Sequence, residues 1–197
     1  MTKTTVWNGG KKTMNLKETI VQDYKRYYSV NNVTFTNLLK AYFDTLSENR
    51  VLSYIVTMRL CSYFDETNKL LLQPFRYRLR KLQLKFGLEI SYKSKIGGGG
   101  FRISHGFGIV IHPNAVIGRN CTVLQNCTIG NNENKSRNQV AELGNNVSLG
   151  AGTKIIGPIK IGDNVITGAN SVIVADVPDN VVVAGVPAKI IRTVERC

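Results

Sequence analysis

The stretch LGNNVSLGAGTKIIGPIKIGDNVITGANSVIVADVP, residues 143–178, decides the fold, because an apolar residue recurs in it at every sixth position. The same spacing starts upstream, and one slot holds threonine. The slots are Ile111, Ile117, Val123, Ile129, Leu143, Leu149, Ile155, Ile161, Thr167 and Ile173. A small or β-branched residue stands two positions before most slots, and glycine often follows them. A six-residue period predicts a parallel β-helix with one short strand and one turn per hexad.

The period slips between Ile129 and Leu143, where fourteen residues equal two hexads plus two. The intervening residues 131–142 are polar, so we expect part of them to leave the coil as an extruded loop. The coil is expected to end near Val174. We therefore divide the chain into a helical N-terminal domain (1–88), a β-helix with this loop (89–176) and a C-terminal tail (177–197).

Before residue 89 the apolar spacing is helical. It predicts helices over about 34–46 and 49–64, and a third one with Pro74 in its first turn and Gly87 at its end. The third helix has a strongly basic face, formed by Arg76, Arg78, Arg80, Lys81 and Lys85. A basic amphipathic helix lies on a membrane in some proteins, and in others it packs on the core with solvated cationic side chains. The sequence leaves both interpretations open.

The charge is concentrated in the same half. The chain carries 26 Lys and Arg against 13 Asp and Glu, and residues 1–96 hold 17 of the former and 7 of the latter. This favours an anionic neighbour: a phospholipid surface, a phosphorylated substrate or a nucleic acid. We find no nucleic-acid-binding motif and expect no nucleic-acid partner. Without a signal peptide or membrane span in the sequence, we expect a cytoplasmic protein, with peripheral contact at the inner membrane left open.

Three motifs resemble the hexapeptide-repeat acyltransferases: HGFGIVI (105–111), VLQNCTIGNN (123–132) and VAGVPAKIIR (183–192). Within that group the chain is most similar to serine acetyltransferases and to bacterial colanic-acid and capsular polysaccharide O-acetyltransferases. The resemblance implies a mainly β protein, in which a left-handed parallel β-helix follows a small α-helical domain. It also implies homotrimers, with pairing of two trimers left open, and an active site between coils that uses acetyl-CoA as donor.

The resemblance makes His105 the general base, because the histidine of this motif removes the acceptor's hydroxyl proton in the family. A neutral imidazole suits this task at cellular pH. Glu89 is the carboxylate expected to orient it, and a backbone carbonyl is the alternative. His112, the only other histidine, matches no catalytic position and is expected at a surface turn.

The resemblance also assigns the binding residues. Gln125 and Asn126 are expected to donate hydrogen bonds to the oxyanion or the acceptor. Ala151 and Ala169 would contact the pantetheine arm of acetyl-CoA through their backbone. Lys189 and Arg192 would meet its phosphates, or belong to a solvated C-terminal tail.

The acceptor is expected to be a sugar hydroxyl in a bacterial polysaccharide or glycolipid precursor. Ser104 precedes His105 where serine acetyltransferases usually carry aspartate, and residues 131–142 lack the second histidine of those enzymes. Serine O-acetyltransferase, in cysteine biosynthesis, is the alternative, and an inactive trimeric scaffold is a third interpretation. No metal is expected, because the histidines and carboxylates show no ligand spacing. Cys121 and Cys127 fall in small inward slots and are interpreted as packing residues.

Overall fold

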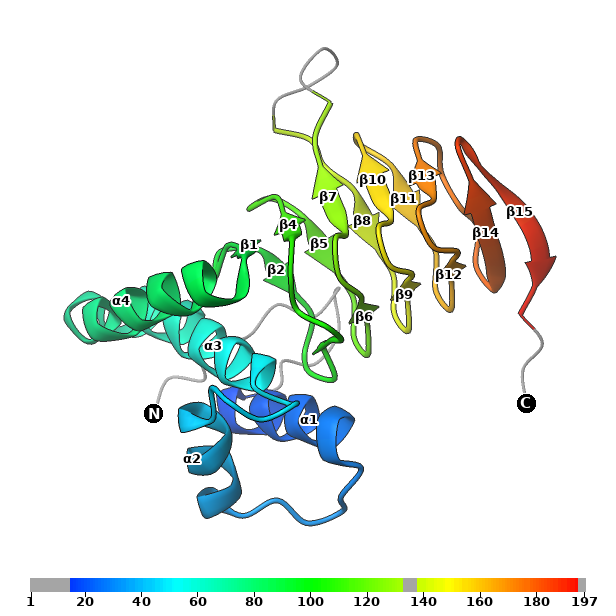
Figure 1. Ribbon diagram of the computed structural model, residues 1–197. Coiled ribbons are helices and arrows are strands. Elements are labelled where there is room, and N and C mark those ends of the chain that lie inside the picture. The colour runs from blue at the N-terminus through cyan, green and yellow to red at the C-terminus, as the bar shows by residue number, and fades with distance from the viewer. Residues whose placement is uncertain (1–14, 133–137, 195–197) are drawn as a thin grey trace.

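The computed structural model describes residues 15–132 and 138–194, and it has a helical half followed by a stack of short strands (Figure 1). The middle of the expected loop, residues 133–137, lies outside the described residues. In the part that is described, no helix has the length and apolarity needed to cross a bilayer.

The helical half has four helices in its described residues: α1 (Leu16–Tyr28), α2 (Phe35–Phe43), α3 (Val51–Thr67) and α4 (Lys69–Phe86). Helix α1 was not predicted from the sequence, and it begins with a capping box between Asn15 and Glu18. The position of Pro74 was also predicted wrongly, because α4 already begins at Lys69. The side chain of Asn68 accepts hydrogen bonds from the first backbone N–H groups and starts the helix there.

Helix α3 packs against α1, α2 and α4 and forms the centre of this half. Its first two turns are buried on all sides, with Tyr54 and Ile55 fully covered. Tyr54 donates its hydroxyl to the carbonyl of Ile90 at 2.7 Å, which ties α3 to the first strand of the stack. Gly87, at φ 62°, ends α4 in the left-handed conformation and turns the chain into that strand.

The strands form three parallel sheets in rotation. Sheet A contains β1 (Leu88–Ile90), β4 (Ile109–Ile111), β7 (Thr128–Gly130), β10 (Lys154–Ile156) and β13 (Val172–Ile173). Sheet B contains β2 (Lys95–Ile96), β5 (Val116–Ile117), β8 (Glu142–Leu143) and β11 (Lys160–Ile161). Sheet C contains β3 (Arg102–Ile103), β6 (Thr122–Val123), β9 (Ser148–Leu149), β12 (Ile166–Thr167), β14 (Val181–Gly185) and β15 (Ala188–Thr193). The chain visits A, B and C in turn, which makes a β-helix.

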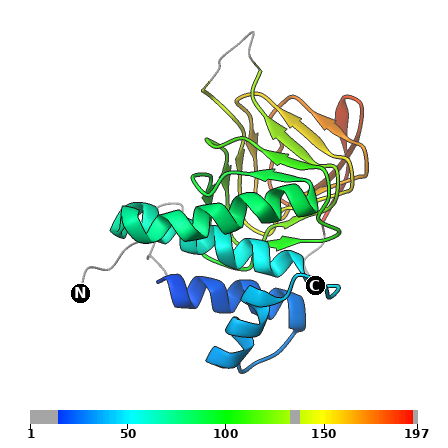
Figure 2. The same cartoon turned by 60° about the vertical axis from the view of Figure 1, so that its left-hand side comes forward.

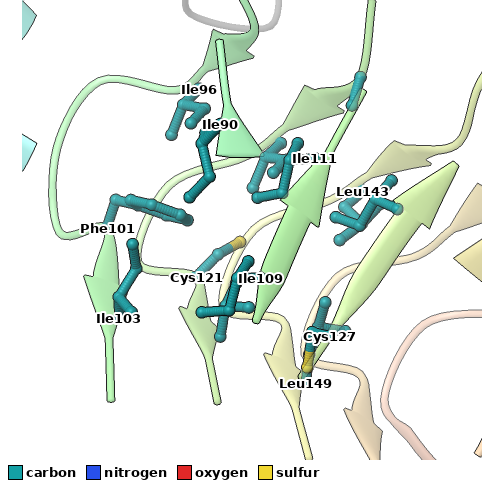
Figure 3. Packing of buried hydrophobic residues seen from close by; sticks show 14 of the residues in the cluster. Ile90, Ile96, Phe101, Ile103, Ile109, Ile111, Cys121, Cys127, Leu143 and Leu149 are labelled. Carbon is teal, nitrogen blue, oxygen red and sulfur yellow. The ribbon is translucent and has the colours of Figure 1, made fainter. Parts of the chain in front are cut away.

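The hexad slots form the core of this β-helix. Each slot residue pairs in register with the slot one coil away, as in the series Ile90, Ile111, Ile129, Ile155 and Ile173 on sheet A. Figure 3 shows slot side chains pointing into the interior from all three sheets, among them Ile90, Ile96 and Ile103. Thr167 occupies a slot because its hydroxyl lies 2.7 Å from that of Thr153, which satisfies both buried polar groups.

Asparagines hold the corners of the coils. Asn120, Asn126, Asn146, Asn164, Asn170 and Asn180 all have φ between 56° and 59°. Asparagine tolerates this left-handed conformation better than most residues. Four of these side chains also bond to each other from coil to coil, from Asn120 through Asn146 and Asn164 to Asn180. The corners are therefore rigid, and the residues beside them have fixed positions.

Two boundaries differ from those we predicted. Ile129 on sheet A and Leu143 on sheet B are consecutive slots, so the insertion adds eight residues to one hexad instead of two residues to two hexads. The coil also continues past Val174. Val181–Gly185 pairs with β12 in parallel, and β15 folds back on it as an antiparallel partner. Residues 181–193 therefore close the β-helix and are not a free tail.

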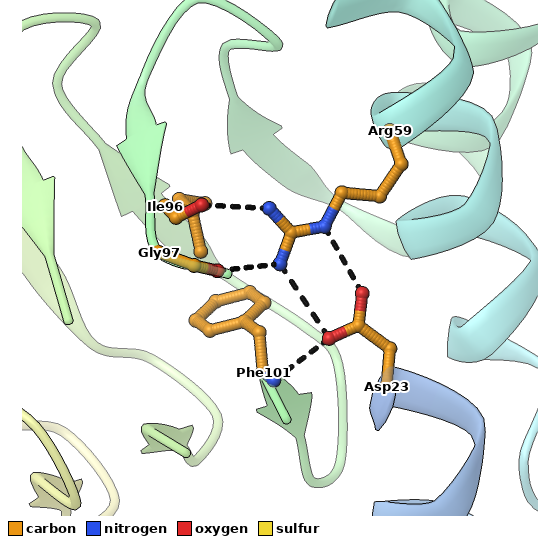
Figure 4. Close-up of polar contacts among 5 residues, drawn as sticks. All are labelled: Asp23, Arg59, Ile96, Gly97 and Phe101. Atoms are coloured by element: carbon orange, nitrogen blue, oxygen red, sulfur yellow. Dashed lines mark hydrogen bonds and ion pairs between the residues drawn. The ribbon is translucent and has the colours of Figure 1, made fainter. Parts of the chain in front are cut away.

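The two halves meet at a buried ion pair, shown in Figure 4. The Arg59 guanidinium from α3 contacts the Asp23 carboxylate from α1 and donates to the carbonyls of Ile96 and Gly97. Asp23 also accepts the backbone N–H of Phe101 at 2.9 Å. The glycine-rich segment 96–100 is thus fixed between helices and coil by polar contacts.

Candidate active site

His105 lies at the corner between β3 and β4, where the first coil turns beneath the helices. Its backbone is in the left-handed region, at φ 55°, and its side chain is exposed. The next residue is Gly106, and helix α3 leaves no room for a side chain there. A Cβ at this position would lie 2.8 Å from Cγ2 of Val51. The helical half therefore fixes the turn that presents the imidazole.

Four of the residues proposed from the sequence lie at the same corner of successive coils. Gln125, Ala151 and Ala169 are in register there, whereas the first coil has two extra residues at this corner, so Phe107 and not His105 is the backbone partner of the Gln125 corner. Sheet C pairs four strand residues in register, one per coil: Arg102, Thr122, Ser148 and Ile166. Three positions after each of them stand His105, Gln125, Ala151 and Ala169. We call these four residues the corner column. With coils about 4.8 Å apart, it is roughly 14 Å long.

A cavity of about 570 Å³ surrounds the His105 end of the corner column. His105, Phe107 and Gln125 line it from the coil. The helical half supplies the opposite wall, with Thr45, Leu46, Arg50, Lys85 and Phe86. The cavity therefore lies between the two halves of the chain, with the imidazole exposed to it.

The charge of this cavity is positive. Arg50 immediately precedes α3 and Lys85 lies in the last turn of α4, and neither takes part in an ion pair among residues 15–132 and 138–194. No lining residue is an aspartate or a glutamate. Two unpaired cations in a concave site favour an acceptor that carries a negative group.

Gln125 presents an unused acceptor in the same place. Its Oε1 atom is buried and has no hydrogen-bond partner in the described part of the chain. A buried acceptor without a hydrogen-bond partner costs free energy, so a ligand that donates a hydrogen bond to it would bind more tightly. Gln125 stands one coil from His105 and one coil from Ala151, between the two ends of the site.

Glu89 and Asn126 are not brought to the imidazole. Glu89 is the outward residue of β1 because Leu88 and Ile90 on either side of it point into the core. No hydrogen bond or ion pair joins it to His105 in the described ranges, and it does not line the cavity. Asn126 is an exposed corner residue at φ 59°, also outside the lining.

The other end of the corner column has free backbone donors. Among the described residues, the N–H groups of Ala151 and Ala169 donate to no partner, while their neighbours bond from coil to coil. Lys189 lies beyond Ala169, opposite Ala184 on the last hairpin, and Arg192 lies opposite Val182. Both cations are exposed. Amides followed by cations suit a long ligand with an amide chain and terminal phosphates.

The remaining candidates have structural roles. His112 lies at a turn, and its Nδ1 accepts the backbone N–H of Asn114 at 3.1 Å, as expected for a turn histidine. Cys121 and Cys127 are buried in the small slots, and burial raises the pKa of both thiols. The described residues contain no cluster of His, Cys, Asp or Glu suited to a metal ion.

Sequence reasoning missed the helical wall of the cavity. We noted Lys85 only as part of a basic face and did not select Arg50 or Phe107. Their contribution depends on how the helices pack over the first coil, and no local pattern records that packing. The HGFG motif is the one local indication of this wall, because its two glycines indicate a turn that another part of the chain approaches closely.

The comparisons with known proteins agree with this geometry. Residues 141–175 match the family described as bacterial transferase hexapeptide, six repeats. A serine acetyltransferase of Synechococcus elongatus is 41% identical over 109 residues, which are 55% of this chain and 44% of that protein. Serine acetyltransferase 2 of Arabidopsis thaliana is 36% identical over 132 residues, 67% of this chain and 40% of that protein. The chain thus spans under half the length of these curated relatives.

The solved structures extend the match into the helical half. A serine acetyltransferase from Brucella abortus in complex with coenzyme A has a TM-score of 0.74 and 26% identity, over 92% of this chain and 69% of its own. A serine acetyltransferase in complex with cysteine has a TM-score of 0.69 and 27% identity, over 88% of this chain and 68% of its own.

These relatives overturn one prediction. We expected a sugar acceptor because Ser104 stands before His105 and the 131–142 segment lacks histidine. The proteins that match in sequence and in structure are serine acetyltransferases, so that prediction is wrong. The chain has a left-handed β-helix behind a helical N-terminal domain, its residues 141–175 match the bacterial transferase hexapeptide family, and it is similar to serine acetyltransferases.

Proposed function

We propose that the protein is an acetyl-CoA-dependent O-acetyltransferase whose acceptor is serine. The observation that carries the proposal is the corner column, which begins with an exposed imidazole in a cationic cavity and ends at unbonded amides near two cations. The names of the relatives supply the acceptor class.

The donor lies along the corner column in this proposal. The pantetheine arm contains two amides, and its carbonyls accept from the free N–H groups of Ala151 and Ala169. Lys189 and Arg192 meet the phosphates at the far end. This orientation carries the thioester toward Gln125 and His105, at the mouth of the cavity.

The acceptor lies in the cavity. The serine carboxylate pairs with Arg50 and Lys85, the two cations without an ion-pair partner in the described chain. Its ammonium donates to the buried Oε1 of Gln125, which supplies the missing partner of that atom. Its hydroxyl then faces His105. Each polar group of the acceptor thus meets a group that is unsatisfied in the structure.

The reaction needs one proton shuttle. A neutral His105 takes the hydroxyl proton as the serine oxygen attacks the thioester carbonyl and forms the new C–O bond. The tetrahedral oxyanion collapses, the C–S bond breaks, and the imidazolium returns the proton to the departing coenzyme A sulfur. The products are O-acetylserine and free coenzyme A, and no other reactant is consumed.

The test is release of coenzyme A thiol from acetyl-CoA in the presence of L-serine, with the product identified by mass spectrometry. Arg50→Gln/Lys85→Gln should raise the KM for serine at least tenfold and leave the KM for acetyl-CoA unchanged. Lys17→Gln/Lys40→Gln, which removes two exposed cations that do not line the cavity, is the matched control. The absence of turnover with serine in the folded protein would overturn the proposal.

The assembly we propose is a homotrimer, or two trimers joined. Its support is the resemblance of the repeat motifs to hexapeptide acyltransferases, which act as trimers. Light scattering after size exclusion should give the mass of three or six chains. A monomer at micromolar concentration would overturn this assembly.

A further inference from the structure

We propose that the outer face of α4 is a docking surface for an anionic phospholipid membrane. The face combines an exposed apolar stripe, cations on both sides of it and a cavity lined by two arginines. Of these features only Lys85, one of the flanking cations, also takes part in the proposed acetyl transfer. The variants that test this inference leave Lys85 unchanged, so the inference is independent of the proposed function.

The stripe consists of Leu70, Tyr77 and Leu84, whose exposed fractions are 81%, 65% and 71%. They recur every seven residues, so they lie on one side of the helix with a drift of about 20° per step. The opposite side of α4 is already packed on the core through Leu72, Leu79, Leu82 and Phe86. Figure 2 shows α4, coloured teal to green, crossing the front of the molecule with nothing over it. The described part of the fold does not cover the stripe.

Cations flank the stripe. At 3.6 residues per turn, Arg76 and Arg80 lie on one side of it and Lys81 and Lys85 on the other. The Lys81 ammonium lies 4.5 Å from the centre of the Tyr77 ring, so it belongs to the same surface. The helix itself, KLLLQPFRYRLRKLQLKF, contains no aspartate or glutamate. Within the described residues, none of these four cations has an ion-pair partner.

A cavity of about 450 Å³ opens beside the stripe, on the arginine side. Arg76 and Arg80 line it together with the polar side chains of Tyr77, Ser91 and Tyr92, and no carboxylate lines it. Two guanidinium groups at i and i+4, with hydroxyl donors opposite, match the donor pattern that a phosphodiester needs. The cavity would take one lipid phosphate while the stripe enters the acyl boundary.

Charge decides between the conceivable occupants. A second copy would have to place an equally cationic face on this one, with like charges opposed across the contact. A bilayer with anionic headgroups offers both the opposite charge and an apolar layer for Leu70 and Leu84, which is the arrangement of interfacial amphipathic helices. The bilayer is therefore the occupant that satisfies all three features.

The experiment is sedimentation of the full chain with vesicles at low and high salt. One vesicle is phosphatidylcholine alone, and the other contains phosphatidylglycerol as about a third of its lipid. The protein should bind the anionic vesicles only, and high salt should release it. Arg76→Gln/Arg80→Gln/Lys81→Gln should lower the partition coefficient about 100-fold, because each cation near such a surface contributes roughly fivefold.

The matched control is Lys17→Gln/Lys40→Gln/Lys160→Gln, which removes the same charge from exposed positions on α1, α2 and β11. It should keep most of the binding. Equal loss in both triple variants would reduce the effect to net charge and overturn the docking face. Thermal unfolding of both variants must match the parent protein, which shows that the fold is intact.

A second measurement tests insertion of the stripe. With Trp7 replaced by phenylalanine, Leu84→Trp supplies the only tryptophan of the chain. Its emission should shift to shorter wavelength on anionic vesicles and stay unchanged with phosphatidylcholine. An unshifted emission in vesicle-bound protein would overturn the proposal. Self-association of the parent protein that the Arg76/Arg80/Lys81 variant abolishes would also overturn it, because the face would then bind a second copy of the chain.

Discussion

Asp23 and Arg59 form a buried ion pair that joins two helices to the first coil of the β-helix. The Nε–Oδ2 distance is 3.0 Å, and the side chains are 0% and 5% exposed. Every other bond of the pair goes to backbone of the segment 96–101. That segment leads through β3 into the His105 turn, so the pair links the stability of the fold to the geometry of the site.

The first prediction concerns this pair. Asp23→Asn should lower the free energy of unfolding by about 3–5 kcal/mol, because Arg59 would keep a buried charge without a counterion. Asp65→Asn, in the exposed pair with Lys69, is the control and should cost less than about 1 kcal/mol. Urea unfolding measures both. Similar small losses in the two variants would show that burial does not matter at Asp23.

The second prediction concerns His105. His105→Asn should lower kcat with serine by about 10²–10⁴, since the base is lost while the left-handed backbone suits asparagine. The KM for acetyl-CoA should change little. His112→Asn is the control and should keep its activity, because that imidazole only accepts a turn hydrogen bond. A His105→Asn enzyme with normal turnover would remove the imidazole from the mechanism.

The sequence predicts the β-helix well because its period records a local geometry. Each hexad slot has the same environment in every coil. Ile111, Ile129 and Ile155 therefore occupy the same position in successive strands of sheet A. The interruption of the repeat after Ile129 was located correctly, but the number of hexads that it spans was predicted wrongly. Residues outside the coil have no period, so a spacing of fourteen does not reveal which slot follows.

The site was predicted only in part, and the reason is again physical. Gln125, Ala151 and Ala169 repeat with the coil, so the period predicts that they share one corner. His105 belongs to the same corner of the first coil, where two extra residues break the repeat. Arg50 and Lys85 reach the cavity through the packing of α3 and α4, which depends on long-range contacts. Glu89 was chosen by alignment to a family position, and strand alternation turns it outward.

The third prediction concerns alkaline stability. Burial raises the pKa of Cys121 and of Cys61 to about 12, while in the unfolded chain each thiol ionises near 9. The folded state therefore holds protons that the unfolded state loses, and stability should fall as pH rises from about 9 to 12. Each thiol contributes at most about 1.4 kcal/mol per pH unit.

Cys121→Ala tests this slope, because the equivalent small slots already hold Ala115 and Ala141. Urea unfolding at about pH 8 and pH 10 should show a smaller pH dependence in the variant than in the parent protein. The buried hydroxyls of Tyr27 and Tyr54, whose pKa values are also raised, keep some slope in both proteins. An unchanged slope would mean that the Cys121 thiol is open to solvent.

The last prediction concerns the donor end of the corner column. Ala169 is exposed and its N–H is unbonded in the described chain, so a larger side chain there changes the path of the donor without disturbing the core. Ala169→Leu should raise the KM for acetyl-CoA at least tenfold, leave the KM for serine unchanged, and reduce the thermal stabilisation by added coenzyme A. The control is Val116→Leu on sheet B, the sheet that does not border the column, and it should change neither constant. If both variants bind coenzyme A as the parent protein does, the pantetheine arm does not follow the column, while the assignment of His105 as base would still stand on the acceptor side.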